Sequence, residues 1–240
     1  MTHVSIPTSM TLEQQATIRE YLTNNKRNPI NISVLGASGS GRRSILQKLA
    51  FGIVPEEYDP TENGEYRKLV HIEECANRLD FSMLLGGESS TQWAWYQLLV
   101  RGGDAFFLVY SVTDRASFEA LHEFHSKLFG LDEDGKPVWV LAAKMDRPRE
   151  DWVVSEQEGK AFSRSIGARF RSVSALEGVG LEDDFAAEVV CEVILSKTPR
   201  LENAGTESGA PGEDSTQGQD RSSIKSVWNK VNRFMHKDPR

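Results

Sequence analysis

The sequence contains few cysteines, no long apolar run and no excess of basic residues. Cys75 and Cys191 are the only two cysteines among 240 residues, too few for a disulfide framework, and we therefore expect a reducing, cytosolic compartment. We expect no membrane-spanning helix and no secretory signal, because no stretch has the length and pattern that either requires. The formal net charge of −7 argues against general nucleic-acid binding. The length allows one sizeable globular domain with tails.

One glycine-rich stretch follows a short apolar run. Residues 30–35 are rich in β-branched side chains and predict a buried strand, and the glycines that follow predict a tight loop opening a helix. In such a loop, successive backbone N–H groups point at one anion, and the N-terminus of the helix adds its positive end. The spacing of Gly36 and Gly41 therefore predicts a phosphate-binding loop. Its expected phosphate contacts are Gly36, Ser38, Gly39, Ser40, Gly41, Arg42, Arg43 and Ser44.

Two arginines follow Gly41, where such a loop usually has Lys and then Ser or Thr. Arg42 stands at the position of the Lys that reaches the outer phosphates, and Arg43 at that of the hydroxyl that binds Mg²⁺. Guanidinium groups suit phosphate oxygens because they carry a permanent charge and forked donors. We therefore hypothesise that Arg43 takes the electrostatic role of the metal. A one-residue bulge is the alternative, in which Arg43 and Ser44 form the usual pair and the hydroxyl is kept.

From residue 30 onward, predicted strands alternate with predicted amphipathic helices. Residues 66–84 predict an antiparallel hairpin, residues 105–110 and 138–142 predict strands that are buried on both faces, and residues 169–173 predict a last strand. This order predicts an α/β fold with a mostly parallel, six-stranded sheet and helices on both faces. A ligand is expected at the carboxyl ends of the strands, where the glycine loop lies.

Composition divides the chain into four expected parts. Residues 1–29 predict an extension with a short helix that starts at the capping box Thr11–Gln14 and packs on the domain or awaits a partner. Residues 30–198 form the expected α/β domain. Residues 199–220 are rich in Gly, Ser, Thr and acidic side chains and predict a disordered linker. Residues 221–240 predict a basic amphipathic helix.

The order of these motifs resembles the Ras branch of small GTPases over roughly residues 31–196. The loop Glu57-Tyr58-Asp59-Pro60-Thr61 is similar to the family's effector loop, whose Thr senses the γ-phosphate and Mg²⁺. Ala143-Lys144-Met145-Asp146 stands where the family has N-K-x-D, and Ser174-Ala175 resembles its base-contacting S-A-K. The resemblance implies binding of GTP or GDP and contacts of the effector loop with effector or regulator proteins. It assigns nucleotide contacts to Thr61, Lys144, Asp146, Ser174 and Ala175.

The departures from the family pattern concentrate on catalysis. The family's D-x-x-G is replaced by Met83-Leu84-Leu85-Gly86, and Gly87 replaces the Gln that orients the attacking water. Metal ions and positioned groups supply most of the rate in phosphoryl transfer. We therefore predict weak or absent hydrolysis, with no catalytic residue and no metal-ligand set. Near the base, the family's Asn, Lys and aromatic residue are replaced by Ala143, Leu176 and Val54.

The last segment combines basic residues with an apolar helical face that includes Trp, which favours an anionic membrane surface or a calmodulin-like groove. A helix folded back on the domain is the alternative. No lipid anchor is expected, and the Rit and Rad/Gem groups of the family likewise end in basic residues without a lipidated Cys. The residues expected at the membrane are Lys225, Trp228, Lys230, Val231, Arg233 and Phe234.

Together these features predict a divergent Ras-like signalling protein at the cytoplasmic face of a membrane, which acts by binding nucleotide and partners while hydrolysis is weak or absent. Two alternatives stay open. One is a competent GTPase switch completed by an activating protein, and the other is a nucleotide-free scaffold.

Overall fold

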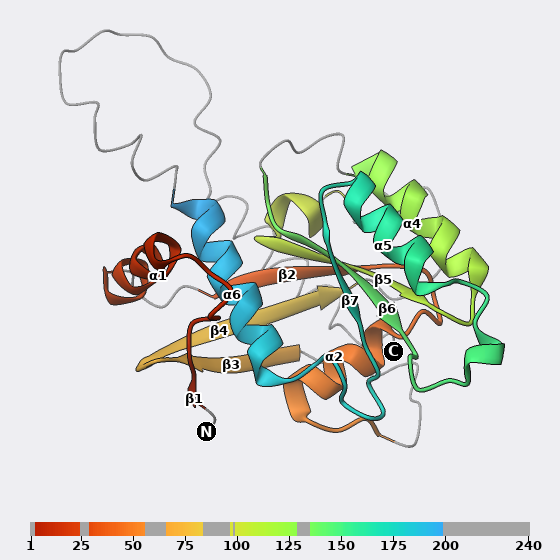
Figure 1. Ribbon diagram of the computed structural model, residues 1–240, viewed down its shortest axis with the longest axis horizontal. Helices are drawn as coiled ribbons and strands as arrows, with labels where there is room; N and C mark the ends of the chain where they lie inside the picture. The colour runs from red at the N-terminus through yellow and green to blue at the C-terminus, as the bar shows by residue number, and fades with distance from the viewer. Residues whose placement is uncertain are drawn as a thin grey trace, which may run out of the picture.

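The structure of the protein is a computed structural model that describes residues 3–24, 29–55, 66–83, 97, 99–128 and 135–198. The helices and strands of these residues appear in Figure 1. They are β1 (His3–Val4), α1 (Leu12–Asn24), β2 (Ile30–Leu35), α2 (Arg42–Phe51), β3 (Tyr66–Ile72), β4 (Cys75–Met83), β5 (Ala105–Ser111), α4 (Arg115–Leu128), β6 (Val138–Ala143), the 3-10 turn η2 (Arg149–Asp151), α5 (Glu156–Ser165), β7 (Arg169–Ser172) and α6 (Asp183–Lys197).

The strands form one sheet in the order β1-β3-β4-β2-β5-β6-β7. Neighbouring strands run parallel except β3 and β4, which form an antiparallel hairpin. The six predicted strands and the predicted hairpin are therefore confirmed. The seventh strand, β1, was not predicted, because two residues carry no periodic pattern.

Helices bury both faces of the sheet through two separate apolar clusters. On one face, α2 and α6 pack against strand residues that include Phe107 and Trp139. On the other face, α4 and α5 pack through Phe118 and Phe162 against residues that include Tyr110. Every residue of β5 is buried, because successive side chains point to opposite faces and both faces are covered.

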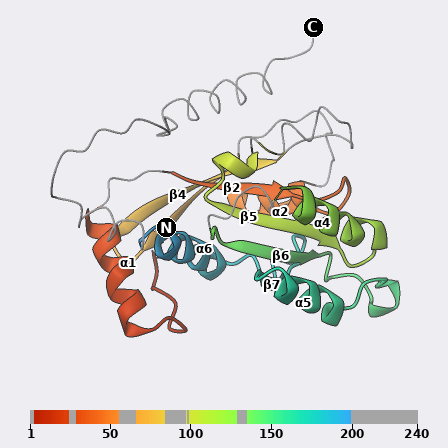
Figure 2. The same ribbon diagram turned by 90° about the horizontal axis from the view of Figure 1, so that it is seen from above.

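The N-terminal segment packs on the same domain, at the β3 end of the sheet. In Figures 1 and 2, α1 lies beside α6, far from β7. Backbone pairing aligns Val4 with Ile72, and Ile18 of α1 is fully buried in the cluster beneath α6. Arg19 adds an ion pair with Glu73 at 2.9 Å. Of the two alternatives for this helix, the structure shows the packed one.

Several predictions concern residues outside the described part of the chain. These are the effector loop 57–61, the positions 84–87, the linker 199–220 and the C-terminal segment 221–240. They stay predictions. Within the described ranges, none of the helices has the length and apolar character needed to cross a membrane.

Candidate nucleotide-binding site

The glycine loop joins the carboxyl end of β2 to the start of α2, at the edge where β5 and β6 also end. Gly36 has a φ of 147°, and an ideal Cβ there would lie 2.3 Å from the carbonyl oxygen of Val109. Gly41 precedes α2 in the left-handed conformation with a φ of 104°. A side chain at either position would strain the backbone, and at Gly36 it would also collide with β5. These glycines therefore keep the turn close to the strand ends.

The two arginines form the first turn of α2, directly after Gly41. Arg42 and Arg43 are only 7% and 8% exposed, although arginine is seldom so deeply buried in proteins. The N–H groups of a first helical turn have no intrahelical acceptor, and the helix dipole makes this end positive. Two cations at such an end make the loop suited to a multiply charged anion.

The hydroxyl of Ser40 lies inside the turn of the loop. Its oxygen, Oγ, is fully buried and has no hydrogen-bond partner in the described part of the chain. It would lie 3.2 Å from an ideal Cβ on Gly36. Because buried polar atoms are nearly always hydrogen-bonded, an unpaired hydroxyl favours a polar ligand at this loop.

A second pair of predicted residues meets at the ends of β6 and β7. Ser174 Oγ donates a hydrogen bond to Asp146 Oδ1 at 2.7 Å and accepts one from the backbone N–H of Glu177 at 3.1 Å. Ser174 is almost fully buried, and so it holds the carboxylate in one orientation. The bond uses one carboxylate oxygen, and no described residue bonds to the other, Oδ2. Lys144 adopts a left-handed conformation with a φ of 66° where the chain leaves β6.

The phosphate loop and the Asp146–Ser174 pair belong to one edge of the sheet. An ideal Cβ on Gly41 would lie 3.2 Å from Cβ of Ala143, the last residue of β6. An ideal Cβ on Gly178 would lie 2.8 Å from Lys48 Cε of α2. The structure thus brings together the predicted contacts at residues 36–44, 144–146 and 174–175, whereas Thr61 lies outside the described residues. Sequence reasoning missed the role of Glu177, because a backbone N–H carries no sequence signal.

The described residues of this loop fit an anion better than they fit a metal. Arg42 and Arg43 bring positive charge, and residues 36–44 contain no carboxylate. Across the described ranges, no group of three or more His, Cys, Asp or Glu side chains could hold a metal ion. Met83 ends β4 at the position where the Ras resemblance places the metal-organising Asp.

A glycine loop of this geometry, at the carboxyl ends of parallel strands and before a helix, defines an α/β protein of the P-loop nucleotide-binding class. The model of the Ras family matches residues 31–194. The chain therefore belongs to the Ras family of small GTPases, a family that binds guanine nucleotides and acts in signalling.

Three curated relatives have similar sequences. The Ras-like protein rasC of Dictyostelium discoideum is 33% identical over 157 residues, which are 65% of this chain and 82% of the relative. A Ras-like protein of Laccaria bicolor is 34% identical over 153 residues, which are 63% of this chain and 72% of the relative. Ras-like protein 1 of Saccharomyces cerevisiae is 31% identical over 172 residues, which are 71% of this chain and 52% of the relative.

Proposed function

We propose that this protein binds GTP or GDP without needing Mg²⁺, and that it signals by binding while its own GTP hydrolysis is weak or absent. The observation that carries the proposal is the burial of Arg43 in the first turn of α2, at the position where the family has its metal-binding hydroxyl. In the same loop, the backbone keeps the close turn at Gly36 and Gly41.

The physical argument rests on charge. A nucleotide phosphate chain needs positive charge near its outer oxygens, and the family supplies part of it as a bound metal. A guanidinium keeps its charge at all physiological pH values and bonds two oxygens at once. A buried guanidinium acts more strongly than an exposed one, because water screens it less. Arg43 is therefore placed to supply charge that a metal supplies elsewhere.

The proposed loss of hydrolysis rests on residues outside the described ranges. Gly87 replaces the Gln that orients water in the family, and residues 83–86 lack the Asp of D-x-x-G. Phosphoryl transfer depends on positioned water and on charge at the transferred group. We therefore expect multiple-turnover phosphate release from GTP to stay at background for the isolated protein. Release that rises in cell extract would instead favour a switch completed by an activating protein.

The first experiment compares nucleotide binding with and without metal. Fluorescent GDP is titrated into the wild type, Arg43→Ser and a control variant, Ser196→Ala, in EDTA and in excess Mg²⁺. We expect similar affinity in both buffers for the wild type and the control. Arg43→Ser should weaken in EDTA by about tenfold or more, the size of one charge-assisted contact. A strict Mg²⁺ requirement of the wild type would contradict the proposal.

A second measurement asks whether nucleotide is bound at all. Mass analysis of small molecules that co-purify with the protein should detect GDP or GTP. A protein that purifies without nucleotide and does not bind it in the titration is a scaffold, the remaining alternative.

Two further parts of the proposal concern partner contacts. We propose that the effector loop Glu57–Thr61 binds effectors or regulators, and that residues 224–235 bind an anionic membrane surface. Sedimentation with anionic vesicles tests the second part. Trp228→Asp should reduce pelleting, whereas Leu12→Asp, at an exposed position of α1, should not. Equal pelleting of the wild type and Trp228→Asp would contradict membrane binding.

A further inference from the structure

Exposed hydrophobic side chains gather around the end of α2 and the loop that precedes α6. Among the described residues, seven large hydrophobic side chains are exposed, and four of them belong to these two segments. They are Phe51 (56%), Ile53 (64%), Leu176 (68%) and Val179 (52%). Leu176 directly follows the base-contacting Ser174-Ala175, so a bound base would cover part of it. The other three have no role in the proposed nucleotide site.

The end of α2, the loop and the start of α6 lie against one another. Lys48 of α2 reaches Gly178 of the loop, because its Cε lies 2.8 Å from an ideal Cβ there. Lys68 Nζ donates to the carbonyl oxygen of Leu49 at 3.1 Å and forms an ion pair with Asp183 Oδ1 at 2.7 Å. Lys68 thus ties the last turn of α2 to the first turn of α6. The exposed hydrophobic residues therefore belong to one area of the surface.

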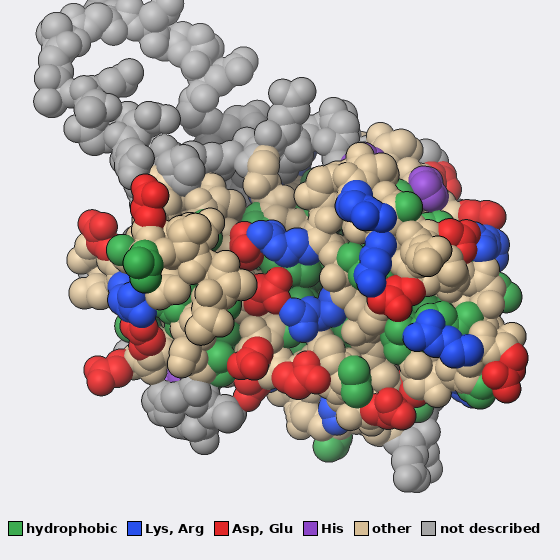
Figure 3. Space-filling view, in the orientation of Figure 1, with side chains coloured by type: hydrophobic (Ala, Val, Ile, Leu, Met, Phe, Trp, Pro, Cys, Tyr) green, Lys and Arg blue, Asp and Glu red, His purple; other side chains and the backbone are tan. Residues whose placement is uncertain are grey.

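Acidic side chains surround this area. Glu177, Glu182 and Asp184 are exposed, and none of them forms an ion pair with a basic residue in the described part of the chain. Figure 3 shows acidic and hydrophobic side chains together over the N-terminal end of α6 and the loop before it. Acidic residues stabilise the start of a helix, which explains Asp184 but not the neighbouring hydrophobic side chains. We call Phe51, Ile53, Val179, Glu177, Glu182 and Asp184 the acidic–apolar patch.

The chain carries a segment with the complementary chemistry. Residues 221–240 contain six Lys and Arg and one Asp, whereas the whole chain has a formal net charge of −7. Residues 1–220 therefore carry −12, and the segment carries +5. Between its basic residues stand large hydrophobic ones at helical spacing: Ile224, Val227, Trp228, Val231 and Phe234. We propose that residues 224–235 dock on the acidic–apolar patch of the same molecule.

The connection is long enough for this docking. The helix α6 has 15 residues, and so its start lies about 22 Å from its end. From Lys197 to Ile224 there are 26 intervening residues. A flexible chain of this length has a root-mean-square span of about 25–30 Å. The segment can therefore return along α6 to the patch, and its tethering gives a local concentration on the order of millimolar.

Docking has a consequence for the membrane role proposed above. The same basic and hydrophobic side chains would face either the patch or an anionic lipid surface, and so the two states exclude each other. Lipid then releases the segment from the loop that carries Ser174 and Ala175. This inference concerns the lipid-free protein, and its test does not require membrane binding or hydrolysis.

The experiment is hydrogen–deuterium exchange on the full chain, without lipid and at one fixed GDP concentration. Variant one is Lys225→Glu/Lys230→Glu/Arg233→Glu, variant two is Glu177→Lys/Glu182→Lys/Asp184→Lys, and variant three combines all six changes. We expect amides at 176–182 and 224–235 to exchange faster in variants one and two. The combined variant should recover protection at both segments, because opposite charges face each other again.

Control variants separate docking from a general charge effect. Glu13→Lys/Glu20→Lys/Glu150→Lys changes the net charge as much as variant two at exposed positions elsewhere, and should leave both segments unchanged. Equal thermal midpoints of all variants establish that each is folded. Unchanged exchange in variants one and two overturns the proposal. So does protection of 224–235 that appears only with anionic vesicles, because membrane binding alone then explains the segment.

Discussion

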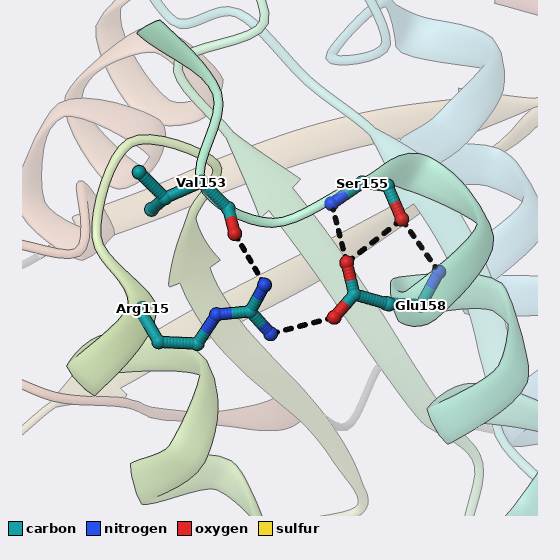
Figure 4. Close-up of polar contacts among 4 residues, drawn as sticks. All are labelled: Arg115, Val153, Ser155 and Glu158. Carbon is teal, nitrogen blue, oxygen red and sulfur yellow. Dashed lines mark hydrogen bonds and ion pairs between the residues drawn. The ribbon is translucent and has the colours of Figure 1, made fainter.

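Arg115 Nη1 donates a hydrogen bond to Glu158 Oε1 at 2.6 Å, and this bond joins the first residue of α4 to the first turn of α5 (Figure 4). Arg115 also donates to the carbonyl oxygen of Val153. The other oxygen of Glu158 accepts bonds from Ser155, from its backbone N–H at 2.9 Å and from its hydroxyl at 2.8 Å. Ser155 Oγ in turn accepts the N–H of Glu158, which completes a capping box.

This arrangement predicts a stability contribution that depends on pH. The hydrogen bond from Arg115 and those from Ser155 lower the pKa of Glu158 from 4.5 to about 2. A carboxyl group whose pKa is lower in the folded state stabilises that state above its unfolded pKa and loses this contribution as the pH falls. We expect Glu158→Gln to be less stable than the wild type at pH 7, with the difference shrinking between about pH 4.5 and pH 2.

Urea unfolding at a series of pH values measures this difference. The control is Glu156→Gln, which removes an exposed pair with Lys160 on the same helix and should cost less than about 0.5 kcal/mol. A deficit of Glu158→Gln that stays constant from pH 7 to pH 3 would show that the ionised carboxylate is not what stabilises the start of α5.

The glycine loop predicts unequal effects of two alanine substitutions. At Gly36, a new Cβ would lie 2.3 Å from the carbonyl oxygen of Val109, and so the loop must move away from β5. At Gly39, with a φ of 77°, nothing lies within 4 Å of a new Cβ, and the cost is backbone strain of about 1 kcal/mol. We expect Gly36→Ala to abolish GDP binding or folding, whereas Gly39→Ala keeps both. Circular dichroism and GDP titration distinguish these outcomes, and equal behaviour of the two variants contradicts the loop geometry.

The N-terminal helix α1 should contribute to the stability of the whole domain. Ile18 is fully buried beneath α6, whereas Leu12 on the same helix is 84% exposed. We expect Ile18→Ala to lower the free energy of unfolding by about 2–4 kcal/mol and Leu12→Ala to change it by less than about 0.5 kcal/mol. Chemical denaturation, followed by tryptophan fluorescence, gives both values. A small effect of Ile18→Ala would mean that the segment is not part of the core.

The bond between Ser174 and Asp146 should support recognition of the base rather than of the phosphates. Ser174→Ala removes the hydroxyl that orients Asp146, and we expect GDP affinity to fall about tenfold, the size of one hydrogen bond to a charged group. Binding of inorganic pyrophosphate should stay unchanged, because residues 36–44 are intact. Calorimetric titration of both ligands tests this difference. An equal loss for both ligands would place Ser174 in general folding instead.

Much of the fold could be predicted from the sequence, because its signals are local. The continuous apolar runs of β5 and β6 indicated strands covered on both faces, and both clusters of the core confirm this. The residues Ser155 and Glu158 predicted the helix start that the structure shows. The glycine spacing located the loop, because only glycine tolerates these φ angles and the close approach to Val109.

The candidate site was predicted as residue types but not as geometry. The sequence alone could not show that Arg42 and Arg43 are buried, since burial depends on what covers them. The strand β1 was missed for the same reason, because its two residues become a strand only when β3 offers them an edge.

By itself, the sequence determined the order of strands and helices, the glycine loop and the kinds of side chain near it, because periodicity and turn chemistry depend on adjacent residues. The tertiary structure alone decided that Ser174 orients Asp146, that Ala143 touches the phosphate loop and that exposed hydrophobic and acidic residues share one surface. These relationships join residues far apart in the chain, and only the packing of helices on the sheet brings them within bonding distance.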